Sequence, residues 1–384
     1  MSEAVIVDAI RTPIGRAFKG SLTDVRADEL AALPLKTLIA RNPKVDFSET
    51  GDVMMGSASA ANEQGFNVGR TATLLSGIDY HVPACTVNRF CASSLQTIRM
   101  GFHAITADEG DQYIAAGVES VSRYGGSGQS EDARNPKLDG SEGSLFDVYI
   151  PMGMTAENVA DKYNVSREAQ DAWAEKSQTR AVEARDNGHF DREIVEVTKD
   201  DGTIVSQDDG PRPGTTMEVL ANLKPVFKEG GSVTAGNACP LNDGAAAVLL
   251  MSAEKAEKLG VEPRARIIAS TVAAIRPEYM GVGPIPAIKA LLEKTGKKIE
   301  DIDIVEINEA FAAQIVPCKE ELGIEDEQLN PFGGAIALGH PFGMTGARIM
   351  TTLLNGLETK KAQYGIESMC VAGGMGMAML VERL

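Results

Sequence analysis

Cysteine and histidine side chains are the groups of this sequence best suited to nucleophilic or acid–base work, and it holds five cysteines and four histidines. Cys91 stands in "TVNRFCASSLQTIRMG", after a β-branched stretch and before a helical pattern. If a helix begins at Ala92 or Ser93, its free N–H groups and dipole favour the thiolate and lower the thiol pKa. The sequence around Cys91 leaves open whether it is a nucleophile or a buried small hydrophobe, whereas for Cys85, inside the strand, we expect only burial.

His340 is the histidine whose setting suits catalysis, since glycines flank it in "GGAIALGHPFGMTG" and permit close approach of a ligand. Pro341 fixes the backbone just after it. We expect His81, His103 and His189 to be surface or helix-packing residues. A neutral imidazole near Cys91 could accept the thiol proton, which predicts a Cys–His pair.

Two further segments end strands with polar or reactive groups. Cys370, in "SMCVAGGMGMAML", precedes a glycine-rich turn that could present N–H groups to an oxyanion. A strand rather than a helix follows this turn, so it does not read as a dinucleotide-binding loop. Asn308 and Glu309, in "INEAFAAQ", are candidates either for catalysis or for capping the next helix.

The elements that must position these residues occur twice along the chain and alternate between strands and helices, which predicts an α/β fold with buried parallel strands. "GDVMMGSASA", "TVNRFCASSLQTIRMGFHAI" and "DQYIAAGVESVS" are answered by "DIDIVEINEAFAAQ", "NPFGGAIALGHPFGMTGARIMTTLLNGL" and "ESMCVAGGMGMAMLVERL". Two such units would pack together, and equivalent loops would converge on one point. That correspondence pairs the segment of Cys91 with the segment of His340.

Residues 121–241 differ in character and read as an insertion over the repeated core. The insertion opens with the polar, glycine-rich "RYGGSGQSEDARNPKLDGSEGS". A helix follows, with Ser166 as its N-cap and Gly188 just past its end. Insertions of this length often carry ligand contacts.

Composition limits the function classes. A formal charge of −17 argues against general nucleic-acid binding, and an anionic ligand would need local basic contacts. No apolar run approaches the ~20 residues of a membrane span, and neither an N-terminal leader nor a peroxisomal C-terminus is evident. Scattered cysteines without a C-x-x-C pair predict neither a metal site nor a disulfide framework. We expect a cytoplasmic protein with free thiols.

Nearly the whole chain resembles the thiolases, enzymes that make or break 3-ketoacyl-CoA. The resemblance rests on "IRTPIG", "VNRFCASS", "GVESVS", "MGMTAENVA", "NDGAAA", "NEAFA", "GGAIALGHPFGMTGAR" and "CVAGGMG", in the order that the family has them. It implies a five-layered αβαβα core of two pseudo-repeated halves with an inserted loop domain. The first half would cover residues 1–120 completed by 242–262, the loop domain 121–241, and the second half 263–384.

The resemblance also implies roles for single residues. Cys91 would be the acylated nucleophile, His340 would activate it, and Cys370 would move the proton at the α-carbon. His340 and a water held by Asn308 would face the thioester oxygen, and the N–H groups of Cys91 and Ala372 would form a second oxyanion hole. The implied contacts to CoA, pantetheine and the acyl chain are Arg212, Leu223, Phe227, Cys239, Met152 and Met280.

The family activity would be reversible thiolysis of 3-ketoacyl-CoA, with CoA as co-substrate and no metal or prosthetic group. Pro151, where biosynthetic acetoacetyl-CoA thiolases usually carry a histidine, and "VNRFC" favour the degradative type that serves fatty acid β-oxidation. The alternatives are a biosynthetic acetoacetyl-CoA thiolase and a non-catalytic thiolase-like lipid carrier; a ketoacyl synthase would need a second histidine in place of Cys370. We expect a homodimer or dimer of dimers and consider a hydratase/dehydrogenase subunit as a partner. If Cys91 and Cys370 flank one substrate carbon, oxidation could join them, and the sequence leaves this open.

Overall fold

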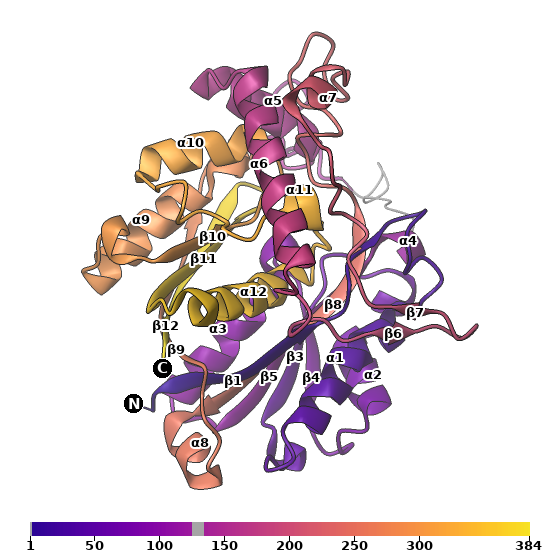
Figure 1. The fold of residues 1–384 in the computed structure, drawn as a ribbon, viewed down its shortest axis with the longest axis vertical. Coiled ribbons are helices and arrows are strands. Elements are labelled where there is room, and N and C mark those ends of the chain that lie inside the picture. Colours follow the sequence, from indigo (N-terminus) through magenta and orange to yellow (C-terminus); the bar gives the residue numbers. More distant parts are fainter. Residues whose placement is uncertain (1, 125–133) are drawn as a thin grey trace.

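The computed structural model describes residues 2–124 and 134–384 (Figure 1). Residues 125–133, within the polar opening of the expected insertion, lie outside the described part. Within the described ranges, no helix is long and apolar enough to cross a membrane.

Two groups of strands repeat one order. The strands of the first group are β1 (Ala4–Arg11), β2 (Gly15–Arg16), β3 (Asp52–Gly56), β4 (Ala84–Val87), β5 (Gln112–Ser120) and β8 (Asn242–Ser252). The strands of the second group are β9 (Ala265–Ala274), β10 (Ile304–Ile307), β11 (Tyr364–Val371) and β12 (Met375–Arg383). The first group runs β4-β3-β5-β8-β1 and the second β10-β11-β12-β9, with a single parallel bridge from Val305 to Leu329 in the place of β4. The predicted repeat is therefore confirmed.

The expectation of parallel strands was only partly correct. β3 pairs in parallel with β4 and β5, and β10 with β11, but β8 and β12 run antiparallel to their neighbours. β12 is antiparallel because a short turn joins it directly to β11, and antiparallel strands are the ones that such turns connect. Cys85 is only partly buried, because β4 is an edge strand.

Helices cover and separate the two groups of strands. The helices of the first half are α1 (Ala27–Arg41), α2 (Val68–Ser76), α3 (Ser93–Thr106) and α8 (Ala253–Leu259), while α4 (Val121–Tyr124) opens the segment that follows β5. The helices of the second half are α9 (Pro284–Thr295), α10 (Ala312–Leu322), α11 (Ala335–Leu338) and α12 (Thr345–Lys360). α3 and α12 pack together between the strand groups, while α1 with α2 and α9 with α10 cover the outer faces (Figure 1). The result is the expected five-layered α/β core.

The segment between β5 and β8 lies along one side of this core. Its elements are α5 (Met152–Tyr163), α6 (Arg167–Asp186), β6 (Val197–Thr198), β7 (Ile204–Val205) and α7 (Met217–Ala221). The Ser166 hydroxyl accepts the N–H of Ala169 and Gly188 has a φ of 72°, so both predicted ends of α6 are confirmed. The limits at 120, 241 and 262 remain our proposal, to which the strand order conforms.

A buried ion pair fastens this segment to the core. Arg11, on β1, donates from Nε to Glu193 at 2.7 Å and from both terminal nitrogens to Asp208 at 2.7 and 2.9 Å. The side chains of Arg11 and Glu193 are fully excluded from water. A buried pair that loses one partner leaves an uncompensated charge.

Arg11→Met should therefore lower the free energy of unfolding by about 3–5 kcal/mol, because Glu193 and Asp208 stay buried without their cation. Urea unfolding at one protein concentration measures this change. The matched control is Arg26→Met, since Arg26 pairs with Asp28 while its own side chain is 50% exposed. That substitution should cost less than ~1 kcal/mol, and equal effects of the two would contradict the assignment.

Candidate active site

Cys91 lies where β4 gives way to α3, as the sequence predicted. A 3-10 turn over Phe90–Ala92 precedes α3, and Phe90 takes a left-handed φ of 47°. The Asn88 side chain accepts the Phe90 N–H at 2.8 Å, and the Ser93 hydroxyl donates to the Phe90 carbonyl at 2.6 Å. These contacts hold the strained turn, which places Cys91 at the helix start with 9% of its surface exposed.

The expected lowering of the Cys91 pKa is wrong. Burial raises the pKa of this thiol to about 12, although the backbone N–H groups of Ala372 and of Cys91 itself act in the opposite direction. Desolvation disfavours a buried thiolate more than the helix start favours it. The thiol is thus neutral at rest and needs a base. The direction of the Ala372 N–H effect on this pKa agrees with a place in the proposed oxyanion hole, which remains a prediction.

His340 is oriented by its own loop. The backbone N–H of His340 donates to Asn242 Oδ1 at 2.9 Å, and the ring Nδ1 lies 2.6 Å from the hydroxyl of Thr345. The same hydroxyl lies 2.8 Å from the carbonyl of Pro341, which can only accept. We therefore assign the hydroxyl proton to that carbonyl and make Nδ1 the donor to Thr345. The neutral ring consequently carries its lone pair on Nε2.

The Nε2 atom of His340 is buried and has no hydrogen-bond partner among the described residues. Burial, and to a lesser extent the positive charge of Arg348, lower the pKa of His340 to about 3. The imidazole is therefore neutral, and Nε2 is free to take a proton or to meet a ligand oxygen.

Cys370, at the end of β11, is fully buried and its Sγ lies 3.2 Å from Gln314 Oε1. Burial raises its pKa well above the ordinary value, and a charge on Cys91 would raise it more. A neutral, protonated Cys370 near Cys91 can serve as a proton donor. All five cysteines are free thiols in this structure, and the oxidation product of Cys91 and Cys370 remains a prediction.

Asn308 follows β10, and both polar atoms of its buried side chain lack a partner within the described chain. Its N–H donates to the carbonyl of Ser368 at 2.9 Å, which fixes its backbone to β11. Buried amides almost always have partners, so this side chain fits a bound water or ligand oxygen. The alternative that Asn308 caps the next helix is wrong, because α10 begins after Phe311.

Glu309 does not cap α10 either. Its buried carboxylate accepts hydrogen bonds from four groups, which come from α6, α11 and the loop before α11. The donors are Trp173 Nε1 at 3.0 Å, the Ser177 hydroxyl at 2.6 Å, Asn330 Nδ2 at 2.8 Å and the Ile336 N–H at 3.2 Å. Glu309 thus anchors α6 to the second half beside Asn308.

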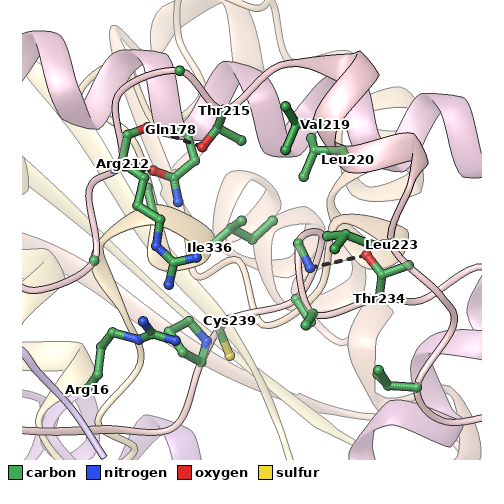
Figure 2. A pocket seen from close by; sticks show the side chains of 18 of the residues that line it. Arg16, Gln178, Arg212, Thr215, Val219, Leu220, Leu223, Thr234, Cys239 and Ile336 are labelled. Atoms are coloured by element: carbon green, nitrogen blue, oxygen red, sulfur yellow. Dashed lines mark hydrogen bonds between the residues drawn. The ribbon is translucent and has the colours of Figure 1, made fainter. Parts of the chain in front are cut away.

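A pocket of about 580 Å³ opens between α7 and the loop that leads to β8 (Figure 2). Four of the residues predicted to contact CoA line it: Arg212, Leu223, Phe227 and Cys239. Met152 and Met280 do not line this pocket. They pack in the apolar cluster that contains Cys370 and Phe311, and Met280 is 1% exposed. Their assignment to the acyl end of a ligand remains a prediction.

Arg16, on β2, is a pocket residue that sequence reasoning missed. Figure 2 shows its guanidinium group near that of Arg212 and near the Cys239 thiol. The lining residues include no acidic side chain, and the pKa of Arg212 is lowered by burial and by the charge of Arg16. Two converging cations suit an anionic ligand. The basic residue just after "IRTPIG" was the available signal.

Comparisons with known proteins agree with this geometry. The family model "Thiolase, N-terminal domain" matches residues 4–254, and "Thiolase, C-terminal domain" matches residues 261–383. The β-ketoadipyl-CoA thiolase of Pseudomonas aeruginosa is 48% identical over 100% of this chain and 99% of its own length. The 3-ketoacyl-CoA thiolase of Citrobacter koseri is 43% identical over 100% of both chains. The crystal structure of the dimeric peroxisomal thiolase of Saccharomyces cerevisiae superimposes with a TM-score of 0.93 at 40% identity, covering 100% of this chain and 98% of that one.

Thr345→Val should lower kcat roughly tenfold or more, because the ring would lose the acceptor that holds the proton on Nδ1. Steady-state kinetics with a CoA thioester substrate measures this loss. Thr351→Val is the matched control, since the Thr351 hydroxyl of the same helix bonds only the carbonyl of Ala347. Equal kinetics for the two variants would show that the Thr345 contact does not orient the base.

Proposed function

The chain belongs to the thiolase family of acyltransferases, and we propose that it cleaves 3-oxoacyl-CoA with CoA through an acyl intermediate on Cys91. The observation that carries this proposal is the packing of the helix that follows Cys91 against the helix that follows His340, where the Ser94 hydroxyl accepts the Ala347 N–H at 2.9 Å. Cys91 and Cys370 are buried thiols, and Nε2 of the neutral His340 imidazole has no partner among the described residues. A non-catalytic lipid carrier would have no use for these groups in such an arrangement.

In the first half-reaction, His340 Nε2 takes the Cys91 proton and the thiolate attacks the 3-oxo carbon. The bond between C2 and C3 then breaks, and its electron pair forms the enolate of acetyl-CoA. Donors at the thioester oxygen, His340 Nε2–H and a water on Asn308, stabilise this enolate. Cys370 gives its proton to C2, which releases acetyl-CoA and leaves the shortened acyl group on Cys91.

In the second half-reaction, the Cys370 thiolate takes the proton of CoA and the CoA thiolate attacks the acyl group on Cys91. The tetrahedral oxyanion would lie at the N–H groups of Cys91 and Ala372. Cys91 leaves as a thiolate and regains its proton from His340. Both acid–base groups then return to their starting states.

For the substrate, we place the six-carbon dicarboxylic class, 3-oxoadipyl-CoA, first. A relative that is 48% identical over its whole length bears the name of a β-ketoadipyl-CoA thiolase. Fatty acid β-oxidation, which the sequence features favoured, stands second and is supported by the relative named 3-ketoacyl-CoA thiolase. Pro151 is the N-cap of α5. Because this residue is a proline, the position lacks the histidine side chain that biosynthetic acetoacetyl-CoA thiolases usually carry there.

A second copy of the chain would cover the edge of the first half. β4 is the last strand of its group. α2 with its flanking loops exposes the apolar side chains Phe66, Leu74, Leu75 and Tyr80, and the turn after β4 exposes Phe90. Phe66 alone is 84% exposed. Exposed apolar surface next to an open strand edge is typical of an interface, and the yeast relative is titled a dimer.

Thiolysis rates with acetoacetyl-CoA, 3-oxohexanoyl-CoA and 3-oxoadipyl-CoA should separate the candidate functions. We expect kcat/KM for 3-oxoadipyl-CoA to exceed that for 3-oxohexanoyl-CoA by roughly tenfold or more, as for a buried partner of the terminal carboxylate. The reverse order would support fatty acid β-oxidation. Activity confined to acetoacetyl-CoA would support the biosynthetic type.

Cys91→Ser should abolish turnover with every substrate while the fold remains.

Arg16→Met should raise KM for CoA by roughly tenfold, because it removes one charge-assisted contact to a CoA phosphate and keeps the apolar stem. Initial rates at varied CoA concentration measure this change. Lys19→Met, in the same loop and outside the pocket, is the control and should leave KM unchanged. An effect confined to 3-oxoadipyl-CoA would instead assign Arg16 to the terminal carboxylate.

A further inference from the structure

Glu119 is a buried carboxylate that the mechanism above does not use. It ends β5 and is fully excluded from water. Its Oε2 accepts the N–H of Ala58 and the N–H of Gly343, both at 2.8 Å, and its Oε1 accepts Gln64 Nε2 at 2.9 Å. Three donors and no acceptor face it in these contacts, which favours the ionised form, while burial acts in the opposite direction and raises the pKa of Glu119 to about 7.

The internal repeat gives Glu119 a counterpart. The last pair of β3 with β5 is Gly56 with Gly117, and the last pair of β10 with β11 is Ile307 with Ser368. Glu119 lies two residues beyond the first of these pairs, and Cys370 lies two residues beyond the second. Glu119 therefore occupies in the first half the place that the proton donor occupies in the second.

Hydrogen bonds lead from Glu119 to the loop of Cys91. Ala58, held by Glu119, accepts Asn88 Nδ2 on its carbonyl at 3.0 Å. The other end of the same Asn88 amide holds the N–H of Phe90, the left-handed residue that precedes Cys91. Glu119 is thus joined to the nucleophile's turn by an unbroken series of contacts.

A second contact of Glu119, with the Gly343 N–H, leads to the loop of His340. Gly343 stands three residues after His340, and its backbone passes so close to the first half that a Cβ atom would come within 2.4 Å of the Val118 carbonyl oxygen. A Cβ on Gly117 would likewise come within 2.1 Å of the Gly343 carbonyl oxygen. The loop of His340 therefore packs directly on the ends of β3 and β5, and the Glu119 carboxylate bonds this loop through Gly343 and the loop after β3 through Ala58.

We propose that Glu119 is a positioning residue for the proposed reaction, whose carboxylate holds the loop of His340 in register with the loop of Cys91. It acts through these loops and not on the substrate. The inference rests on the proposed function, and wild-type thiolysis tests that function separately.

The test is Glu119→Gln, which keeps the shape of the side chain. The Ser120 N–H binds Gln64 Oε1 at 2.7 Å, so Gln64 cannot turn its amide, and its NH₂ group must face residue 119. A glutamine at 119 consequently turns its NH₂ group toward Gln64 Nε2 or toward the N–H groups of Ala58 and Gly343, so it opposes at least one donor in either orientation. We expect kcat to fall by roughly tenfold to 100-fold, as for a small misplacement of catalytic groups, while KM for CoA stays within about threefold.

The exchange variant Gln64→Glu/Glu119→Gln supplies the sharper readout. The Ser120 N–H again meets a carboxyl oxygen, the new amide at 119 donates to residue 64, and its oxygen accepts Ala58 and Gly343. The Ser59 carbonyl, 2.9 Å from Gln64 Nε2 in the native chain, then faces a carboxylate oxygen, and the one proton of the Ser57 hydroxyl can serve only one of these two acceptors. A positioning role therefore predicts that the exchange restores part of the lost kcat.

Glu382→Gln is the matched control, because Glu382 lies near the far end of β12, where its partners are Arg266 and Gln363. It should leave kcat unchanged. The proposal is overturned if Glu119→Gln keeps wild-type kcat, if its loss only follows the fraction of folded protein, or if the exchange variant is as impaired as the single one.

Discussion

Exclusion of water from the reacting groups is the constraint on which the rest of this structure depends. Burial raises the pKa of the Cys91 thiol to about 12 and lowers that of the His340 imidazole to about 3. Neither group is charged at rest, so ionic attraction between a thiolate and an imidazolium cannot hold the site together. Hydrogen bonds and packing must position it instead. Charge then develops only when substrate oxygens meet the fixed donors, whose effect is strongest where water is excluded.

The internal repeat supplies the positions that this constraint requires. Each half sends the ends of its parallel strands and the start of its middle-layer helix to the same place. Cys91 and His340 arrive on the loops before α3 and α12, and Asn308 and Cys370 follow β10 and β11. The inserted segment is fastened to the first half by Arg11 and to the second by Glu309. These contacts hold the pocket at the edge of the inserted segment in a fixed position relative to Cys91 and Cys370.

Local sequence patterns predicted the parts of this arrangement that depend on residues close to one another in the sequence. The Ser166 cap, the start of α3 beside Cys91 and the doubled order of strands all follow from residues close in sequence. Burial does not, and the helix start alone therefore gave the wrong direction for the Cys91 pKa. Arg16 and Arg212 are almost 200 residues apart in the sequence, and Glu119 gains its partners from two distant segments, one between β3 and α2 and one before α12. Long-range contacts of this kind produce no periodic pattern in the amino-acid sequence, so they cannot be predicted from it in this way.

Mass spectrometry of the protein mixed with acetoacetyl-CoA in the absence of free CoA tests the central claim most directly. The account predicts one acetyl group per chain, located by peptide mapping on Cys91 and removed when CoA is added. Cys239 and Cys370 should stay unmodified. An acetyl group on either of these thiols, or no covalent intermediate during productive turnover, would contradict the assignment of Cys91 as the buried nucleophile.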